Sequence, residues 1–583
     1  MNNKKMCWWL ALLCALTLLP FLGYEYNTKG EPREAIVSMT MLDTGNWILP
    51  RNNGGELPYK PMFFHWCIAL VSWLWGAVTE VTSRIPSALA LIATVLATFW
   101  FYAKRSLQYP ALITALLLLT CMELHRAGGN CRVDMVLTAC TVGAINLLYR
   151  WHERGMKGLP WLALMLMSLG TLTKGPVGAV LPCFVMGCYL LLQRVNLWRA
   201  FFTMIGFVLL SCVLPLLWYV AAWQQGGQEF LDLVYEENIG RMSGTMTYES
   251  HVGPWYFNLL TLTYGMVPFT LLLIMGLCTE RFSRAGFKAP FSGGIKAVAM
   301  RFWRWLDGME RVDQFSLVSA VMILFFYCIP ASKRSVYLMP MYPYMCWFIA
   351  RYMIHLADSG RRVVRNYGHF LAGLSMVLLV ALVVLKLQLV PDTFFHGKHA
   401  YDNALMLHNL EQIGGFLPAF CIVLTTVAAI RWWFYTHKQK SVVRGDLSMV
   451  MLLTVAIYLS VDGAYKPAAL AAKSQKQVAA TLQDEIFQPA DADVYEYIEE
   501  AEQALGNPIH YFELNFFLHD RIQNFKKQQP EHGYLLIGEQ DAELRIKDFE
   551  QQGYRFEQRY ATRQRVSKQP LRVYYFERNA SAL

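Results

Sequence analysis

The chain has 583 residues, of which 55% are hydrophobic and 16% charged, and its formal net charge is +10. Soluble globular proteins do not use so much apolar surface, and the long continuous apolar runs exclude the alternating pattern of a β-barrel. The composition therefore predicts a polytopic α-helical membrane protein. The excess of Lys and Arg is typical of basic cytoplasmic loops, so we expect a lipid bilayer and no nucleic acid as a partner.

Basic loops set the predicted topology, because Lys and Arg concentrate on the cytoplasmic side of a membrane. The first apolar run lacks a signal-peptide cleavage site, so we interpret it as a retained helix. The Trp-rich segment 62–78 disturbs the alternation if it crosses, and we expect it to lie along the external interface. Thirteen spans remain, with the N-terminus inside and the C-terminus outside. They cover roughly 7–23, 85–103, 110–126, 135–149, 159–173, 177–192, 201–222, 255–277, 314–331, 335–356, 368–388, 411–434 and 447–463.

The last 120 or so residues change in character. Strand-like stretches such as "YLLIGE" and "LRVYYFE" alternate with amphipathic helical stretches, which predicts a small α/β domain on the external side. We expect two domains, a membrane-spanning domain at 1–463 and an external α/β domain at 464–583. The first external loop of the membrane domain is expected at about 24–84.

This topology gathers ionisable residues on the outer face, several of them at the ends of spans. Ionisable groups at membrane depth are functional candidates. A lipid phosphate suits such a cluster, because Lys and Arg bind phosphate and a carboxylate can transfer protons. The group comprises Glu31, Arg33, Glu34, Lys60, Arg132, Asp134, Lys174, Glu236, Glu237, Arg241, His251, Lys333, Arg334 and Tyr337.

Structural roles compete with these functional ones. Arg132 and Asp134 could pair with each other at a helix end. Lys174 precedes a helix-breaking Gly-Pro pair and could simply extend to the interface. The segment "YEENIGRMSG" around Arg241 could be a solvated helix, and His251 an interfacial histidine.

Ordered motifs over roughly residues 1–350 resemble a known family. They read "GEPREAIVSMTMLDTGNWILPRNNGGELPYKPMFFHW", "RIPSALA", "CRVDM", "LTKGPVG", "ENIGR", "SHVGPWYF" and "SKRSVYLMPMYP". As a set they are similar to GT-C-type glycosyltransferases that use lipid-linked sugars. The nearest branch is the aminoarabinose (undecaprenyl phosphate–aminoarabinose) transferases, with the protein O-mannosyltransferase-like group behind it.

The resemblance implies 13 spans, juxtamembrane helices in the first external loop and a periplasmic C-terminal domain. It implies a polyprenyl-phosphate sugar donor, used at the periplasmic face of the bacterial inner membrane. The phosphate-binding residues of the family fall here on Arg33, Lys60 and Tyr337, and its second acidic site falls on Asp134.

Two positions depart from the family pattern. Gly30 stands where relatives carry an acid, which leaves Glu31 as the nearest carboxylate and Glu34 one helical turn further on. Tyr59 replaces the family's metal-linked glutamate. Of that site only His251 remains, so we expect no firmly bound metal and keep a divalent ion as an open alternative.

The functional hypothesis is an inverting glycosyl transfer to a lipid A-like lipid, a glycan or a protein of the cell envelope. Glu31 or Asp134 would act as the general base, and cations would bind the leaving phosphate. The expected substrate-binding residues are Arg33, Glu34, Lys60, Arg132, Lys174, Arg241, His251, Lys333, Arg334 and Tyr337. The alternative is a flippase that moves the lipid-linked sugar without chemistry.

Overall fold

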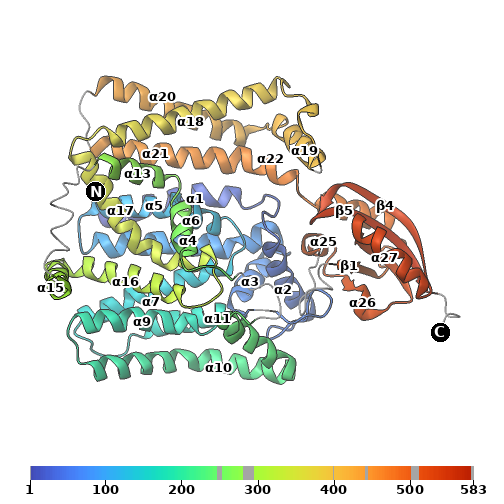
Figure 1. Cartoon of the computed structure of the whole chain (residues 1–583), viewed down its shortest axis with the longest axis horizontal. Helices are drawn as coiled ribbons and strands as arrows, with labels where there is room; N and C mark the ends of the chain where they lie inside the picture. Colours follow the sequence, from blue (N-terminus) through green and yellow to red (C-terminus); the bar gives the residue numbers. More distant parts are fainter. Residues whose placement is uncertain are drawn as a thin grey trace.

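The computed structural model describes residues 2–58, 60–245, 252–279, 294–397, 399–439, 444–499 and 511–578. Long helices lie side by side, and a small sheet domain caps one end of the bundle (Figure 1). The N-terminus lies at the opposite end from this C-terminal domain. The two ends of the bundle are therefore different, as a fixed orientation in a membrane requires.

Eight helices among the described residues are long and apolar enough to cross a bilayer. Two bent pairs of helices raise the count to ten, α5 (Gln108–Thr120) with α6 (Met122–Gly128) and α12 (Phe257–Gly265) with α13 (Phe269–Thr279), bent by 64° and 102°. The eight are α1 (Asn3–Leu18) with a 3-10 turn to Phe21, α4 (Glu80–Ala103), α7 (Val133–Glu153), α10 (Leu197–Tyr235) continued to Ser243, α16 (Arg311–Cys328), α18 (Val363–Lys386), α20 (Phe416–Lys438) and α21 (Arg444–Ser460) continued to Ala471.

Three further helices account for the rest of the predicted spans. They are α8 (Trp161–Lys174), α9 (Val177–Leu192) and α17 (Tyr342–Asp358), with 14, 16 and 17 residues. Every predicted span thus falls on a helix or a bent pair, and the multi-pass helical membrane fold is confirmed. The count of thirteen is not confirmed, because these three helices are shorter than the roughly 20 residues that a bilayer core requires.

The Trp-rich segment forms α3 (Phe63–Trp75), which has 13 residues. At 1.5 Å per residue such a helix reaches about 20 Å, less than the thickness of a bilayer core. Helix α3 packs against α2 (Gly30–Thr44) and α4 near the end of the bundle that carries the C-terminal domain (Figure 1). Its placement along a membrane interface stays a prediction.

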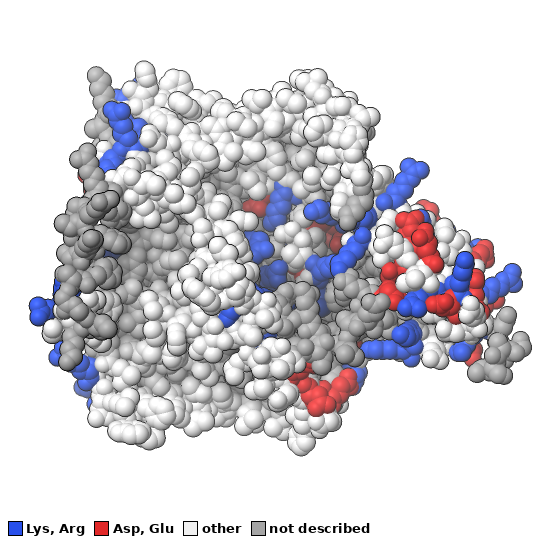
Figure 2. Space-filling model, viewed as in Figure 1, with Lys and Arg blue, Asp and Glu red and all other residues white. Residues whose placement is uncertain are grey.

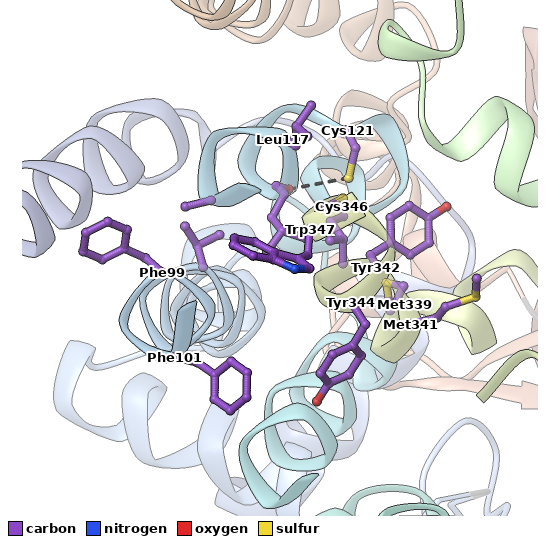
Figure 3. Close-up of a cluster of buried hydrophobic side chains, with 14 of the residues drawn as sticks. Phe99, Phe101, Leu117, Cys121, Met339, Met341, Tyr342, Tyr344, Cys346 and Trp347 are labelled. Carbon is purple, nitrogen blue, oxygen red and sulfur yellow. Dashed lines mark hydrogen bonds between the residues drawn. The ribbon is translucent and has the colours of Figure 1, made fainter. Parts of the chain in front are cut away.

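An aromatic core holds the central helices together (Figure 3). Trp347 on α17 stacks on Tyr102 of α4 with 4.1 Å between ring centroids. The indole of Trp347 also donates a hydrogen bond to Asp313 of α16 over 2.7 Å. This arrangement buries the aromatic surface and satisfies the one polar atom of the indole, so it ties three helices to one another.

The C-terminal domain contains a five-stranded mixed sheet in the order β2-β1-β3-β5-β4. Its strands are β1 (Val494–Tyr497), β2 (Ile522–Asn524), β3 (His532–Gly538), β4 (Tyr554–Val566) and β5 (Gln569–Arg578), and its helices include α25 (Phe512–Phe517), α26 (Phe525–Gln528) and α27 (Glu539–Gln551). Strand β1 runs parallel to β2 and β3, and β5 runs antiparallel to β3 and β4. The predicted α/β character is confirmed.

The C-terminal domain docks on the first loop of the membrane domain. Helix α25 packs on α2, and the rings of Tyr26 and Phe516 meet edge to face at 5.1 Å. The carboxylate of Asp520 accepts hydrogen bonds from the Thr40 hydroxyl at 2.9 Å and from the backbone N–H of Asn53 at 2.8 Å. The helix that links the two parts runs on to Ala471, past the predicted boundary at 463.

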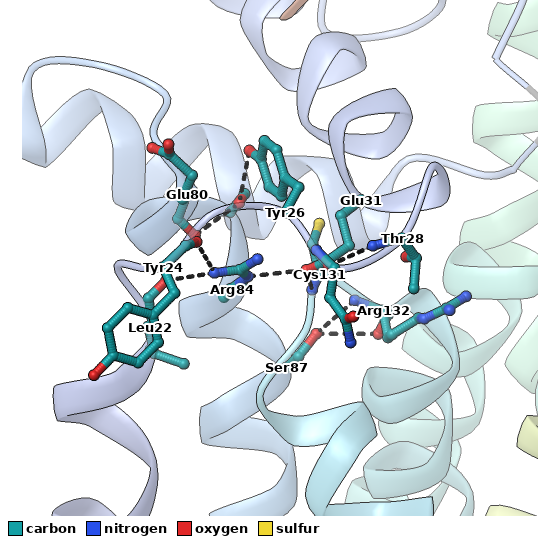
Figure 4. Close-up of polar contacts among 12 residues, drawn as sticks. Leu22, Tyr24, Tyr26, Thr28, Glu31, Glu80, Arg84, Ser87, Cys131 and Arg132 are labelled. Atoms are coloured by element: carbon teal, nitrogen blue, oxygen red, sulfur yellow. Dashed lines mark hydrogen bonds and ion pairs between the residues drawn. The ribbon is translucent and has the colours of Figure 1, made fainter. Parts of the chain in front are cut away.

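A buried ion pair anchors the start of α2 (Figure 4). Glu31 is fully buried and accepts a hydrogen bond of 2.9 Å from Arg84 of α4. The same carboxylate accepts backbone N–H groups of Asn27 and Thr28 and, at 2.8 Å, that of Cys131. Arg84 in turn donates to the carbonyl oxygens of residues 22, 24 and 25. The pair is saturated by its surroundings, which is the condition for keeping two charges in a protein interior.

We predict that breaking this pair from one side unfolds the region. Glu31→Leu or Arg84→Met alone leaves an unpaired buried charge, which costs about 3–5 kcal/mol. The double variant removes both charges and should cost less than the sum of the two single changes. Thermal stability of detergent-purified protein, followed by size-exclusion chromatography, measures all four proteins, and strictly additive losses would contradict the pairing.

Helices α8 and α9 approach closely at two glycines, and this contact gives a second prediction. A Cβ at Gly178 would lie 2.2 Å from the carbonyl carbon of Gly170. Gly178→Ala should therefore separate the helices and cost about 1–3 kcal/mol of stability. Gly187→Ala on the same helix is the control, since its Cβ would meet Met204 at an ordinary 3.6 Å. Equal melting temperatures of the two variants would contradict the close packing.

Candidate active site

Asp134 and Lys174 form an ion pair at neighbouring helix ends. Asp134 lies in the first turn of α7 and Lys174 is the last residue of α8, so each charge opposes the partial charge of its own helix terminus. The Lys174 ammonium also lies 4.0 Å from the ring centroid of Tyr337. Both members of the pair are largely buried, with 14% of each side chain exposed.

The turn after Lys174 brings a third element to the site. Gly175 has φ of +90°, and a Cβ there would approach the Asn238 side-chain oxygen to 3.0 Å. Glycine is therefore required both by the backbone conformation and by the space. Asn238 belongs to a π-helical turn, Glu236–Gly240, that interrupts the long helix after α10. Such turns often mark functional sites in helices.

Glu237 of that turn holds two of the predicted cations. Its carboxylate pairs with Lys60 from the loop before α3 and, through both oxygens at 2.8 Å, with Arg241. Arg241 also donates to the Tyr337 hydroxyl at 3.4 Å. Lys60, Arg241, Lys174 and Tyr337 thus converge from four separate segments of the chain.

Burial and neighbouring charges shift the pKa values of two of these groups. Burial lowers the pKa of the Lys60 ammonium below its ordinary value. Burial raises the pKa of Tyr337, but the cations Lys174, Arg241 and Arg334 outweigh it, so the net pKa is below the ordinary value. Tyr337 lies in the 3-10 turn Ser335–Met341, which precedes α17. The lowered pKa of Tyr337 therefore indicates a strongly positive local potential.

The first turns of α2 supply a second ion-pair group. Glu34 accepts hydrogen bonds from Arg33 at 3.0 Å and from the ring of His65 at 2.9 Å. Burial raises the pKa of Glu34, yet the hydrogen bond from His65 and the charge of Arg33 hold it well below its usual range. Arg334 belongs to the same region, since the charges of Tyr337, Arg241, Asp134 and Arg33 all act on its guanidinium.

Arg132 lies at the first predicted departure from the family. Its guanidinium is 4.0 Å from the position that a Cβ of Gly30 would take, and the backbone N–H of Arg132 donates to Ser87 at 2.9 Å. An acid at position 30 would therefore meet this cation. In this chain Gly30 has no acidic side chain with which Arg132 could pair.

Two predicted site residues have structural partners instead. Glu31 accepts hydrogen bonds from Arg84 and from three backbone N–H groups and so anchors the start of α2, and its assignment as general base stays a prediction. Lys333 points its ammonium at the backbone oxygens of Tyr327, Cys328 and Pro330 and so caps the end of α16. His251 lies outside the described residues.

Sequence reasoning left His65 out and did not assign a role to Glu237. His65 is fully buried within the Trp-rich helix, where an apolar pattern hides it. The sequence offered one indication of its role, because His65 lies five residues after Lys60, on the helix that follows the loop. Glu237 stood among the external charges, but only the fold shows that it joins Lys60 to Arg241.

Little space remains between these side chains. A pocket of about 30 Å³ is lined by Lys60, Lys174, Gly175, Glu237 and Asn238 and by apolar residues of α10. That volume is about the share of one water molecule in the liquid. The charged side chains around this pocket therefore bind one another in this conformation.

A metal site finds no support in the geometry that is described. Within the described ranges, no three His, Cys, Asp or Glu side chains gather closely enough to hold a metal ion. His65 and Glu34 bind each other, and His251, the ligand expected from the resemblance, is outside those ranges. We therefore derive no chemistry through a metal.

Comparison with known proteins places the chain among transferases. A family model described as dolichyl-phosphate-mannose-protein mannosyltransferase matches residues 59–219. An undecaprenyl phosphate-alpha-4-amino-4-deoxy-L-arabinose arabinosyl transferase of Edwardsiella ictaluri is 24% identical over 525 residues, covering 86% of this chain and 88% of that protein. The enzyme of the same name from Pseudomonas aeruginosa PAO1 is 26% identical over 399 residues, which cover 67% of each chain.

The fold has a solved counterpart. The crystal structure of ArnT from Cupriavidus metallidurans, bound to undecaprenyl phosphate, superimposes with a TM-score of 0.65 at 16% identity, covering 100% of this chain and 99% of that one. The alignment therefore includes the C-terminal domain as well as the helices. The matching family model and the relatives that align with most of the chain show that this protein is a multi-pass membrane glycosyltransferase, and its fold is that of the ArnT crystal structure.

Proposed function

We propose that the protein transfers a sugar from a polyprenyl-phosphate donor to an acceptor at the external, periplasmic face of the bacterial inner membrane. The names of the relatives and the ligand of the ArnT crystal structure support undecaprenyl phosphate as the carrier. The observation that carries the proposal is the convergence of Lys174 and Arg241 on Tyr337, with Lys60 joined to Arg241 through Glu237.

The cluster is suited to a lipid phosphate because its cations outnumber their carboxylate partners. Lys60 and Arg241 share the single charge of Glu237, whereas Asp134 pairs with Lys174 and Glu34 with Arg33. The phosphodiester of the donor carries one negative charge, and the polyprenyl phosphate that leaves is a monoester with up to two. A phosphate that enters beside Tyr337 would therefore add the negative charge that Lys60 and Arg241 lack, and Glu237 would keep its cationic neighbours.

The chemical step then breaks one bond and forms another. The bond between the anomeric carbon of the sugar and the phosphate oxygen breaks, and the electron pair remains on the polyprenyl phosphate. The acceptor oxygen forms the new bond from the opposite face, which inverts the anomeric centre. Cations placed where this negative charge develops stabilise the leaving phosphate.

Asp134 is the carboxylate that we propose as general base. Asp134 pairs with Lys174, which in turn lies over the ring of Tyr337, whereas Glu31 is buried in the Arg84 network. An acceptor hydroxyl would give its proton to Asp134 as the new bond forms. A phosphate acceptor has no such proton to lose, and Asp134 would then only orient it.

The acceptor is a lipid, a glycan or a protein of the cell envelope, and we favour a lipid A-like lipid because aminoarabinose transferases are among the relatives that align with most of the chain. The competing flippase hypothesis has no support from the relatives, which are named as transferases. A flippase would also be expected to carry its polar groups near the bilayer midplane. Here they lie at helix ends.

Removal of a phosphate-binding cation should abolish most of the transfer. We predict that Lys60→Ala and Arg33→Ala each lower the transfer rate about 10²–10³-fold, the usual loss for one electrostatic donor. Arg194→Ala is the control, since Arg194 lies at the far end of α9 and 84% of its side chain is exposed. Release of label from a radiolabelled undecaprenyl-phosphate sugar in proteoliposomes measures the rate. Near wild-type transfer by both site variants would contradict the phosphate site.

Replacement of Asp134 separates proton transfer from donor binding. Asp134→Asn should lower transfer to a hydroxyl acceptor by about 10²–10⁴-fold, as expected for a general base. Asp134→Glu should restore part of that rate, and both variants should bind tritiated undecaprenyl phosphate within a few-fold of wild type. An active Asp134→Asn enzyme would rule out the role that we propose for this carboxylate.

A further inference from the structure

A groove follows the seam between the C-terminal domain and the helices. Its inner chamber has a volume of about 460 Å³ and lies between the loop before α2, helix α19 (Ala400–Glu411) and α25. An outer chamber of about 510 Å³ continues along α19 and the β4–β5 hairpin. Both volumes are in the range of ligand-binding clefts. Neither chamber is lined by the residues of the Tyr337 cluster.

One ion pair lies where the two chambers meet. Arg565 of β4 donates to Asp402 of α19 at 2.8 Å and also contacts the ring of His399, and both chambers are lined by Arg565 and Asp402. This contact connects the C-terminal sheet to the segment between α18 and α20, which contains α19. The groove is thus built from both domains and from segments far apart in the sequence.

The groove is basic in character. Its walls carry Lys29, Lys473, Arg563, Arg565 and Lys568. Of the three carboxylates in the walls, Asp402 is paired with Arg565 and Glu539 is paired with Arg572. Burial raises the pKa of the third, Glu513, to about 7, so much of it is uncharged at neutral pH. Lys and Arg side chains gather along this seam on the face shown in Figure 2.

The remaining lining matches the chemistry of carbohydrates. Four amide side chains, three aromatic rings and two aliphatic hydroxyls line the inner chamber, namely Asn27, Asn403, Gln475, Gln564, Tyr26, Tyr511, Phe512, Thr28 and Ser567. The buried Oε1 of Gln475 and Oγ1 of Thr28 have no hydrogen-bond partner among the described residues. Buried polar atoms are nearly always satisfied, so these two oxygens leave hydrogen-bonding capacity unused at the wall of the chamber.

The inner end of the groove meets the phosphate cluster. The guanidinium of Arg33 lies 5.9 Å from the ring centroid of Phe512, which lines the groove. Thr28 and Lys29 immediately precede α2, the helix that carries Arg33 and Glu34. A ligand in the groove would therefore end beside the position that we assign to the donor phosphate.

We propose that this groove binds an anionic carbohydrate headgroup, the sugar-phosphate part of the acceptor, and that the C-terminal domain thereby selects the acceptor. The inference rests on the proposed transfer reaction and extends it from the donor to the acceptor. Two chambers in line favour an oligosaccharide over a single sugar. The basic walls favour a phosphorylated or carboxylated one.

Charge reversal in the groove tests this inference without touching the donor site. Lys473 and Arg563 are exposed residues, one in each chamber, so Lys473→Glu combined with Arg563→Glu should fold normally. Lys527→Glu combined with Lys547→Glu, two exposed residues of α26 and α27 outside both chambers, is the charge-matched control. Purified protein receives a radiolabelled undecaprenyl-phosphate sugar and envelope membranes as the source of acceptor.

The double variant should transfer at least tenfold less label than wild type and the control, and it should bind tritiated undecaprenyl phosphate as wild type does. Soluble glucosamine disaccharide bisphosphate should inhibit wild-type transfer, whereas the neutral disaccharide chitobiose should not. Equal transfer by the variant and wild type, or equal inhibition by the two sugars, would overturn the groove assignment. If wild type itself fails to transfer label, the proposed function fails instead.

Discussion

The buried pair of Glu31 and Arg84 is the interaction on which the site depends. It joins the loop after α1, the first turn of α2, helix α4 and the segment before α7, because one carboxylate and one guanidinium bind atoms from all of them. A buried ion pair of this kind stabilises only when its remaining donors and acceptors are satisfied. Here they are, and α2 therefore has a fixed start. Arg33 and Glu34 lie in the first turns of that helix, beside the phosphate cluster. Lys29 immediately precedes the helix and lines the groove between the C-terminal domain and the helices.

Electrostatics explains why the rest of the cluster takes the form it has. Cations near the apolar interior of a membrane protein are costly unless they are paired. Glu237, Asp134 and Glu34 supply the partners, and each is held by a separate element of the fold. The ion pairs thus hold several cations close together, and a phosphate that binds between them meets a positive potential. The lowered pKa of Tyr337 is a direct consequence of that potential.

Much of the architecture could be predicted from the sequence, because apolar runs and basic loops report helices and their ends directly. The number of spans could not, since α8, α9 and α17 are too short to be distinguished by length and hydropathy. The convergence of Lys60, Lys174 and Tyr337 was also predictable from motifs at span ends. The anchoring of α2 by Glu31 was not, because its partner Arg84 lies 53 residues away, just before a predicted span. The backbone contacts of Lys333 could not be predicted either, since carbonyl oxygens at a helix end carry no sequence signal.

In the proposed reaction the protein breaks the bond between sugar and polyprenyl phosphate and does not move the intact lipid. The most direct measurement follows both products when purified protein in proteoliposomes receives an undecaprenyl-phosphate sugar labelled with tritium in the sugar and ³²P in the phosphate, together with envelope membranes. If the protein transfers the sugar, tritium appears on the acceptor while ³²P remains with free undecaprenyl phosphate. Movement of both labels across the bilayer in one intact molecule would contradict it.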